Sequence, residues 1–256
     1  FMSFELITIP CLSDNYAFIL YNVENRSAFL VDAPEADPIN EVLSKNNLNL
    51  EKIFLTHHHA DHIDGLDKIL EKHSAVTIGA KADIHRLPKL DEYVEAGDLF
   101  LFQGQAGKIF DVSGHTIGHI ALYISAQNIL FSGDSLMALG CGRLFEGSAE
   151  QMWHSLSQLL SLPDSTQICS GHEYTENNAS FALSIDPKNH DLVKRSEQVK
   201  LERSKGLFTV PSELGLEKKT NPFLRPFDKN IRKNLNMQKS TDVEVFSEIR
   251  KLKDKF

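Results

Sequence analysis

Cysteine, tryptophan and long apolar runs are all scarce in this sequence. Its 256 residues include 3 cysteines and 1 tryptophan. Cys11, Cys141 and Cys169 form no CxxC pair, so a disulfide framework is not expected and a reducing, cytoplasmic environment fits best. No apolar run approaches the roughly 20 residues of a membrane-spanning helix, and the first residues lack the features of a signal peptide. We interpret Cys141, which lies between two glycines, as a small residue packed into a tight turn, with a catalytic thiol as the alternative.

Positive charge is also scarce over most of the chain. The net charge is −8, and residues 1–217 carry 16 lysines and arginines against 30 aspartates and glutamates. Residues 218–256 reverse this balance, with 11 basic against 5 acidic residues. The acidic body disfavours nucleic acid as a partner. The basic tail indicates contact with an anionic molecule, and a solvated helical face is the alternative.

What is present is the composition of an ordinary globular protein, with 41% hydrophobic residues to form a core. Up to about residue 173, short strands alternate with isolated helices, which favours a mixed α/β layer structure. One helix is expected to begin with Asp37 as its N-cap and Pro38 at its first position. The expected strands are 4–9, 16–21, 28–31, 53–56, 76–78, 98–102, 108–112, 121–124 and 129–131, and the expected helices are 37–46 and 63–73.

The pattern changes near residue 174. From Tyr174 onward there is almost no strand signal, and prolines separate the helical segments. We therefore predict two domains, an α/β body over residues 1–173 and a helical domain over residues 174–256. The helices expected in the second domain are 177–185, 189–204, 228–237 and 242–253.

Residues 56–65 read T-H-H-H-A-D-H-I-D-G and follow a predicted strand. His57 and His59, two residues apart on an extended segment, can point the same way. Asp61 and His62 fall on the turn that opens the next helix, so we predict two neighbouring metal ions rather than one. His58 should point away and is interpreted as a supporting residue. The alternative for the whole tract is a solvated, histidine-rich turn.

Three further polar residues each follow a glycine at the end of a predicted strand, namely His115, Asp134 and His172. Asp134 is the candidate bridge between the ions, and a water held there would become a hydroxide nucleophile. Asp61 and Asp134 are the carboxylates that we assign to catalysis. His119 either supports a ligand or belongs to the core. Seven ligands suit two ions rather than one tetrahedral ion: His57, His59, Asp61, His62, His115, Asp134 and His172.

Four motifs in this order, T-H-H-H-A-D-H, G-H-T-I-G-H, F-S-G-D and S-G-H-E-Y-T, resemble the metallo-β-lactamase superfamily. With N-P-F-L-R and the closing R-K-L-K-D-K-F, the whole chain resembles the glyoxalase II (hydroxyacylglutathione hydrolase) family. The resemblance implies an αββα sandwich with a C-terminal helical domain. It implies one ion bound by His57, His59 and His115, a second bound by Asp61, His62 and His172, and Asp134 with a hydroxide between them. The ions would be zinc, with iron and manganese as alternatives.

The resemblance also implies a reaction, the hydrolysis of S-D-lactoylglutathione to D-lactate and glutathione in methylglyoxal detoxification. In C-G-R-L-F-E-G, Arg143 keeps the family's cation, whereas Phe145 replaces a tyrosine that helps to bind glutathione. Tyr174, Arg250 and Lys253 match the other glutathione contacts of the family. The alternatives are a persulfide dioxygenase of the same fold with a single iron, and a non-catalytic binding protein. We expect a monomer acting on a small-molecule substrate.

Overall fold

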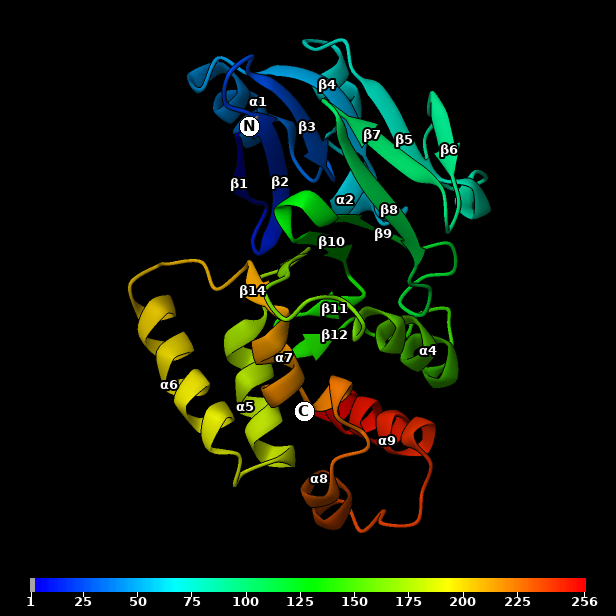
Figure 1. Cartoon of the computed structure of the whole chain (residues 1–256), viewed down its shortest axis with the longest axis vertical. Coiled ribbons are helices and arrows are strands. Elements are labelled where there is room, and N and C mark those ends of the chain that lie inside the picture. Colours follow the sequence, from blue (N-terminus) through cyan, green and yellow to red (C-terminus); the bar gives the residue numbers. More distant parts are fainter. Residues whose placement is uncertain (1–2) are drawn as a thin grey trace. The chain divides into compact units, whose positions relative to one another are not determined.

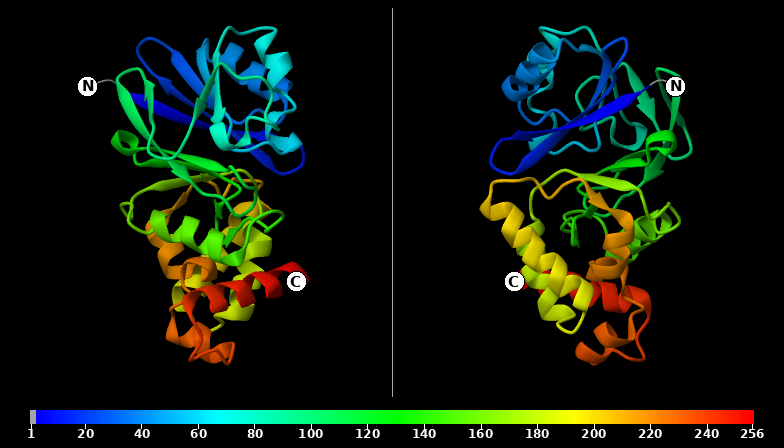
Figure 2. Two further views of the ribbon diagram at one scale, coloured as in Figure 1. Left: turned by 90° about the vertical axis from the view of Figure 1, so that its right-hand side faces the viewer. Right: turned by 60° about the vertical axis from the view of Figure 1, so that its left-hand side comes forward.

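The computed structural model describes residues 3–256, which form two compact units (Figures 1 and 2). The first unit contains the chain up to Asp111 together with Gly118–Gly133. The second contains Val112–Ile117 and Asp134–Phe256. Residue 174 lies within the second unit, and the domain boundary predicted there stays a prediction.

The first unit begins with a sheet whose strand order follows the sequence. Its first three strands pair antiparallel and the next three pairings are parallel. Parallel neighbours need crossover connections, and the first unit supplies helices for two of them. The strands are β1 (Phe4–Cys11), β2 (Asn15–Asn22), β3 (Ser27–Val31), β4 (Asn49–Phe54), β5 (Val76–Ala80) and β6 (Glu92–Val94), and the helices are α1 (Ala36–Lys45), α2 (Ala60–Ile63) and α3 (Leu66–Leu70).

A second set of strands packs on the first sheet through phenylalanine rings. The ring of Phe29 on β3 lies 5.0 Å from the rings of Phe100 and Phe102 and 5.7 Å from that of Phe131. Such contacts fill the space between two stacked sheets. The predicted α/β sandwich is therefore confirmed. The strands, in antiparallel order β10-β9-β8-β7, are β7 (Leu99–Phe102), β8 (Gln105–Asp111), β9 (Ile120–Ile124) and β10 (Ile129–Gly133).

Two details of the predicted helices are wrong. The helix α1 begins at Ala36 with Glu35 as its N-cap, so Asp37 does not cap it. The continuous helix expected over 63–73 is two short helices, α2 and α3, interrupted around Gly65. A Cβ at Gly65 would lie 2.8 Å from the backbone oxygen of Ala33, so the chain passes too close here for any side chain.

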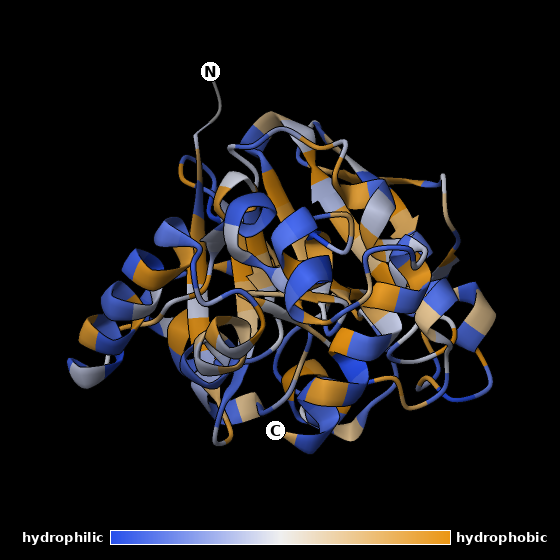
Figure 3. Cartoon of the chain, turned by 90° about the horizontal axis from the view of Figure 1, so that it is seen from below, coloured by the Kyte–Doolittle hydropathy of each residue, from blue (hydrophilic) through white to orange (hydrophobic). Residues whose placement is uncertain are grey.

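The second unit contains helices packed around aromatic side chains. The ring of Phe223 lies 6.1 Å from that of Phe181 and 5.7 Å from that of Phe246, and Trp153 brings α4 onto α9 (Figures 1 and 2). Hydrophobic and hydrophilic residues alternate along the helical ribbons (Figure 3). The elements are β11 (Leu136–Met137), β12 (Gly140–Cys141), α4 (Ala149–Leu159), β13 (Gln167–Ser170), α5 (Thr175–Ile185), α6 (His190–Ser204), β14 (Ser212–Glu213), α7 (Leu214–Thr220), α8 (Lys229–Asn234) and α9 (Asp242–Lys255).

The four helices expected after residue 174 are confirmed as α5, α6, α8 and α9. The helices α4 and α7 and the short strands β6, β11, β12 and β14 were not predicted. The signal for α4 was present, because Ser148 caps it and Met152, Leu156 and Leu159 are buried at helical spacing.

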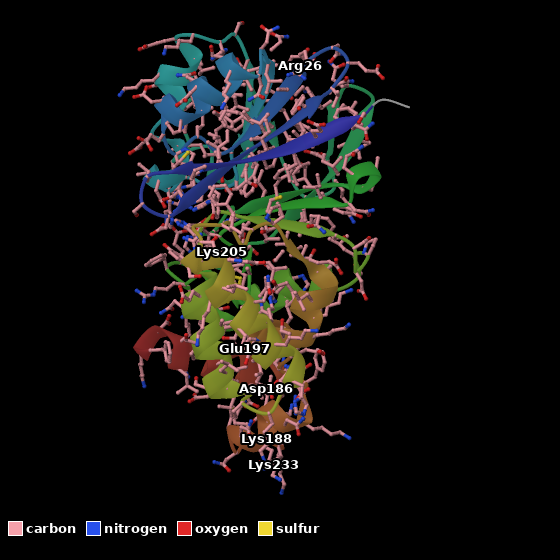
Figure 4. All side chains as sticks on the ribbon, turned by 90° about the vertical axis from the view of Figure 1, so that its left-hand side faces the viewer. Arg26, Asp186, Lys188, Glu197, Lys205 and Lys233 are labelled. Atoms are coloured by element: carbon pink, nitrogen blue, oxygen red, sulfur yellow. The ribbon has the colours of Figure 1, made fainter. Side chains whose placement is uncertain are left out.

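Much of the basic excess of residues 218–256 is solvated or internally paired. Lys233 is exposed (Figure 4). Arg225 bonds to Asp186 and Arg232 bonds to Asp242, each at 2.5 Å. The alternative of a solvated face therefore accounts for part of this charge, and Arg250 and Lys253 on α9 are considered below. Among the described helices, none has the length and apolar character needed to cross a bilayer.

Candidate metal centre

The histidine tract lies directly after β4 in the first unit. The strand ends at Phe54, two residues earlier than predicted, and the backbone of His59 is extended before α2 begins at Ala60. The ring of His57 lies 4.8 Å from that of His59 and 4.2 Å from that of His62. The predicted convergence of these three imidazoles is therefore present within this unit.

Asp61 lies beside these rings. Its Oδ2 atom is 3.7 Å from Nε2 of His62. The side-chain amide of Asn15 donates to Oδ2 and to the backbone oxygen of Asp61, each at 2.9 Å. Asn15, at the start of β2, therefore fixes both the backbone and the carboxylate of a predicted ligand.

A buried carboxylate that sequence reasoning missed, Asp32, organises the predicted ligands of the first unit. Oδ1 accepts the backbone N–H of Thr56 at 2.8 Å, and Oδ2 accepts the Thr56 hydroxyl at 2.9 Å. Oδ2 also lies 2.8 Å from Nδ1 of His62. The signal was available, because Asp32 directly follows the predicted strand 28–31, as the predicted ligands follow theirs.

This network determines which imidazole nitrogens carry hydrogen. The Thr56 hydroxyl donates its one hydrogen to Asp32, so its contact with Nδ1 of His57, at 3.0 Å, must be donated by the imidazole. Nδ1 of His62 likewise donates to Asp32, because an ionised carboxylate only accepts. Both rings then present Nε2 with a lone pair. That is the arrangement of a metal-binding histidine whose other nitrogen is held by a neighbouring group.

His58 and His119 support the tract rather than extending it. Nδ1 of His58 lies 2.7 Å from Oδ2 of the fully buried Asp83, and its ring lies 5.0 Å from that of His59. That His58 points away from the other histidines stays a prediction. The His119 ring is fully buried and stacks on His57, with centroids 4.6 Å apart. Gly133 has a φ of +51°, and a Cβ there would lie 2.7 Å from both His119 and Thr56. Glycine is needed at this position.

The second unit holds the other three predicted ligands together. Nε2 of His115 lies 3.3 Å and Nε2 of His172 lies 3.2 Å from the same carboxylate oxygen, Oδ2 of Asp134. All three residues are buried. Nδ1 of His115 is 2.8 Å from the backbone oxygen of Arg143, which can only accept, so this nitrogen carries a hydrogen.

The donor chemistry of the predicted ligands in each unit fits a divalent metal ion. Imidazole Nε2 atoms facing a carboxylate oxygen are an arrangement that a cation stabilises, and zinc and related ions prefer these ligands. Each predicted ligand belongs to a group of histidine and carboxylate side chains that could hold a metal ion.

A glycine allows the segment around Arg143 to lie against the predicted ligands of the second unit. A Cβ at Gly142 would lie 1.9 Å from the backbone oxygen of Asp134 and 2.9 Å from Nδ1 of His115. The backbone N–H of Gly142 donates to Ser135 at 3.1 Å. No side chain fits between this segment and the predicted ligands.

Two aromatic residues flank the predicted ligands of the second unit. The ring of Phe145 is 5.3 Å from that of His115, and Tyr174 stacks on His172 with centroids 4.7 Å apart and planes 6° from parallel. Phe145 is 61% exposed and Tyr174 is 40% exposed. The side chain of Arg143 is also exposed, with its guanidinium 6.0 Å from the Phe145 ring.

The two remaining predicted contacts lie on α9. Arg250 is buried and bonds to Asp254 and to the backbone oxygen of Cys141. Lys253 donates to the side chain of Asn177. Burial, with a smaller contribution from the Arg250 charge, lowers the pKa of Lys253 to about 8.

The surroundings of Cys141 disfavour a nucleophilic thiolate. The residue is 6% exposed, in the short hairpin of β11 and β12. Burial raises the pKa of its thiol to about 11, although the neighbouring Arg250 opposes the shift. The thiol is therefore protonated near neutral pH, which favours the interpretation of Cys141 as a small packed residue.

Two protein families match consecutive parts of the chain. Residues 15–172 match the metallo-beta-lactamase superfamily, and residues 173–256 match the hydroxyacylglutathione hydrolase C-terminus. Among solved structures, the chain is similar to the BLEG-1 B3 metallo-beta-lactamase, with a TM-score of 0.68 and 22% identity over 86% of this chain and all of that one. It is also similar to TTHA1623, solved in a di-iron-bound form, with a TM-score of 0.63 and 22% identity over the same shares.

Curated relatives match over the full length. The hydroxyacylglutathione hydrolase of Roseobacter denitrificans is 53% identical over 255 residues, and that of Ruegeria pomeroyi is 51% identical, in both cases over 100% of each chain. The chain therefore belongs to the hydroxyacylglutathione hydrolase family of the metallo-β-lactamase superfamily.

Proposed function

We propose that this protein hydrolyses S-D-lactoylglutathione, and related S-2-hydroxyacylglutathione thioesters, to the 2-hydroxy acid and glutathione. This would be the second step in methylglyoxal detoxification. The observation that carries the proposal is full-length similarity to hydroxyacylglutathione hydrolases, including their C-terminal part. Buried histidines with fixed Nδ1 hydrogens support it, since a hydrolase using a metal-bound hydroxide needs such ligands.

The proposed cofactors are two divalent ions, zinc in the first instance, with iron and manganese as alternatives. One would be held by His57, His59 and His115, the other by Asp61, His62 and His172, with Asp134 shared. When bound, the ions would supply a hydroxide at neutral pH and stabilise negative charge on the thioester carbonyl oxygen.

The chain's own residues would keep this ligand set ordered. Asp32 holds the hydrogen on Nδ1 of His62 and the Arg143 carbonyl holds that on Nδ1 of His115, which leaves each Nε2 available to a metal ion. Asp134 would act as the catalytic carboxylate shared by the ions, because its Oδ2 already lies between two imidazoles. Asp61, held by Asn15, would be the second catalytic carboxylate.

The glutathione part of the substrate would bind to the second unit. Glutathione carries two carboxylates, which Arg143, Arg250 and Lys253 could neutralise. Tyr174 offers a hydroxyl and Phe145 an apolar ring, and both are exposed beside predicted ligands. The missing hydroxyl at Phe145 should weaken binding by about 1 kcal/mol without abolishing it.

One experiment tests the proposal. Purified protein should hydrolyse S-D-lactoylglutathione in a steady-state assay, and the same sample should contain two metal ions per chain. A two-metal preparation that leaves glutathione thioesters intact would refute the activity. A single iron with oxygen consumption on glutathione persulfide would instead support the dioxygenase alternative. We further propose a cytoplasmic monomer, which is consistent with the three free, buried cysteines.

A further inference from the structure

Arg250 makes hydrogen bonds to other residues of the chain that suit a structural role. The residue is 6% exposed. Its Nε and Nη2 atoms donate to Oδ1 of Asp254, at 3.0 and 2.7 Å, and Nη1 donates to the backbone oxygen of Cys141 at 3.0 Å. Its guanidinium also lies 5.1 Å from the ring centroid of Phe223. The edge of the guanidinium that best binds a carboxylate is thus already occupied by Asp254.

The backbone that Arg250 holds leads directly to the predicted ligands. Gly142 follows Cys141 and lies against the backbone oxygen of Asp134 and Nδ1 of His115. Arg143 comes next, and its backbone oxygen accepts the Nδ1 hydrogen of His115 at 2.8 Å. A displacement of Cys141 would therefore move the atom that fixes the orientation of His115 and the glycine packed on Asp134.

Other helices hold the preceding part of the same hairpin. The side-chain amide of Asn178 on α5 donates to the oxygen of Ala138, and that of Asn221 donates to the oxygens of Met137 and Gly140. These contacts secure the start of the hairpin, whereas Arg250 bonds to the residue next to Gly142. Together with the bond from the Gly142 N–H to the backbone oxygen of Ser135, the bond from α9 is thus placed to fix the end of the hairpin beside His115.

We propose that Arg250 is a positioning residue for the metal centre. From α9 it fixes the segment 140–143, and through that segment it orients His115 and Asp134. This inference rests on one part of the proposed function, namely that His115 and Asp134 bind the metal ions. It goes beyond a contact with the substrate carboxylate, because it requires Arg250 to affect metal binding when no substrate is present.

The test is zinc affinity, measured on the full chain by competition with a chromophoric chelator, together with kcat and KM. Arg250→Met keeps the length and apolar contacts of the side chain but removes its donors. We expect zinc affinity to fall roughly 10- to 100-fold, as when groups behind metal ligands are removed, and kcat to fall with it. Arg250→Lys, which keeps the charge and one donor for the Cys141 oxygen, should recover part of the loss.

Two matched variants separate this role from substrate binding. Lys251→Met changes the next, exposed residue of α9 and should leave zinc affinity and kcat unchanged. Arg143→Met removes an exposed cation, while its backbone oxygen remains, so it should raise KM without changing zinc affinity. Wild-type zinc affinity and kcat in Arg250→Met, with only KM raised, would overturn the proposal.

The test still gives a decision if a variant does not fold or if the wild-type protein is inactive. If Arg250→Met does not fold, as judged by circular dichroism, Arg250→Gln, which loses the charge and the guanidinium group, decides the question, and wild-type zinc affinity in that variant with a raised KM counts against positioning. If zinc-loaded wild-type protein fails to cleave the thioester, the proposed function falls, yet the zinc affinities still decide the role of Arg250.

Discussion

At the scale of single residues, Asp32 shows how one carboxylate can set the proton positions of several ligands. Asp32→Asn keeps the size of the side chain and tolerates its φ of +60°, but replaces an acceptor with a donor. We expect zinc affinity to fall roughly 10- to 100-fold, because Nδ1 of His62 loses its acceptor and the Thr56 hydroxyl, which accepts from Nδ1 of His57, loses its own. The free energy of unfolding should fall by about 1–3 kcal/mol, measured by urea denaturation.

The matched control for that substitution is Asp91→Asn. Asp91 accepts from the backbone N–H and the hydroxyl of Thr77, each at 2.8 Å, in the same pattern as Asp32 on Thr56. It contacts none of the predicted ligands in the described hydrogen bonds, so stability should fall while zinc affinity stays unchanged. Equal loss of zinc affinity in both variants would show that Asp32 acts only through stability.

The lowered pKa of Lys253 predicts that substrate binding depends on pH. Burial, Arg250 and the opposing charge of Asp254 set its pKa at about 8, below the usual 10.5. The ammonium is therefore present below pH 8 and is lost as the pH rises through 8. If it binds a glutathione carboxylate, KM should rise as the pH passes 8 and then level off, because Arg143 and Arg250 stay charged. Lys253→Arg, which stays charged, should flatten the KM profile between pH 7 and 9.5, and an unchanged rise would exclude Lys253 as its cause.

Phe145 is the position at which this chain departs from its family's pattern. Its ring is 61% exposed, so Phe145→Tyr adds a hydroxyl without disturbing the core. If the hydroxyl bonds to glutathione, binding should strengthen by about 1 kcal/mol, which corresponds to a roughly fivefold lower KM. Steady-state kinetics on S-D-lactoylglutathione measure this change. An identical KM would place Phe145 outside the peptide-binding surface.

At the scale of elements, the sequence predicted structure best where signals were local and repeated. The strands around Phe29, the helices α5 and α6 and the three Gly-preceded ligands follow from hydrophobic pattern and turn residues. The break at Gly65 depends instead on the approach of the Ala33 backbone, which no local pattern reveals. The bond from Arg250 to Cys141 joins residues 109 positions apart and could not be predicted from either segment alone.

The position of the β11–β12 hairpin should affect kcat, and a substitution at its end tests this. Gly142→Ala should displace the end of the hairpin, because a Cβ would lie 1.9 Å from the backbone oxygen of Asp134. Since that atom is backbone, it cannot move aside cheaply, and we expect kcat to fall at least roughly tenfold, as when groups behind metal ligands are disturbed. Ala138→Gly, in the same hairpin, tests for a general loosening and should cost less. Wild-type kcat in Gly142→Ala would show that the hairpin adjusts freely.

At the scale of the whole molecule, the predicted ligands are divided between the two units. His57, His59, Asp61 and His62 belong to the first, whereas His115, Asp134 and His172 belong to the second. If the same ions bind to both sets, as we propose, metal binding must stabilise the whole chain against unfolding. A ligand present at 100 times its dissociation constant adds about 2.7 kcal/mol to the free energy of unfolding.

Zinc should therefore raise the thermal unfolding midpoint of metal-free protein by several degrees, and Asp134→Ala should remove most of that rise together with the activity. The reason is that Asp134 supplies the carboxylate between two imidazoles, so its loss weakens both proposed sites. Differential scanning calorimetry with and without zinc, at matched protein concentration, measures the shift. Asp91→Asn, with its intact ligand set, should keep the full zinc-dependent rise. An Asp134→Ala protein that retains two ions and full activity would refute the shared carboxylate, because the two ions would then be held by separate ligands.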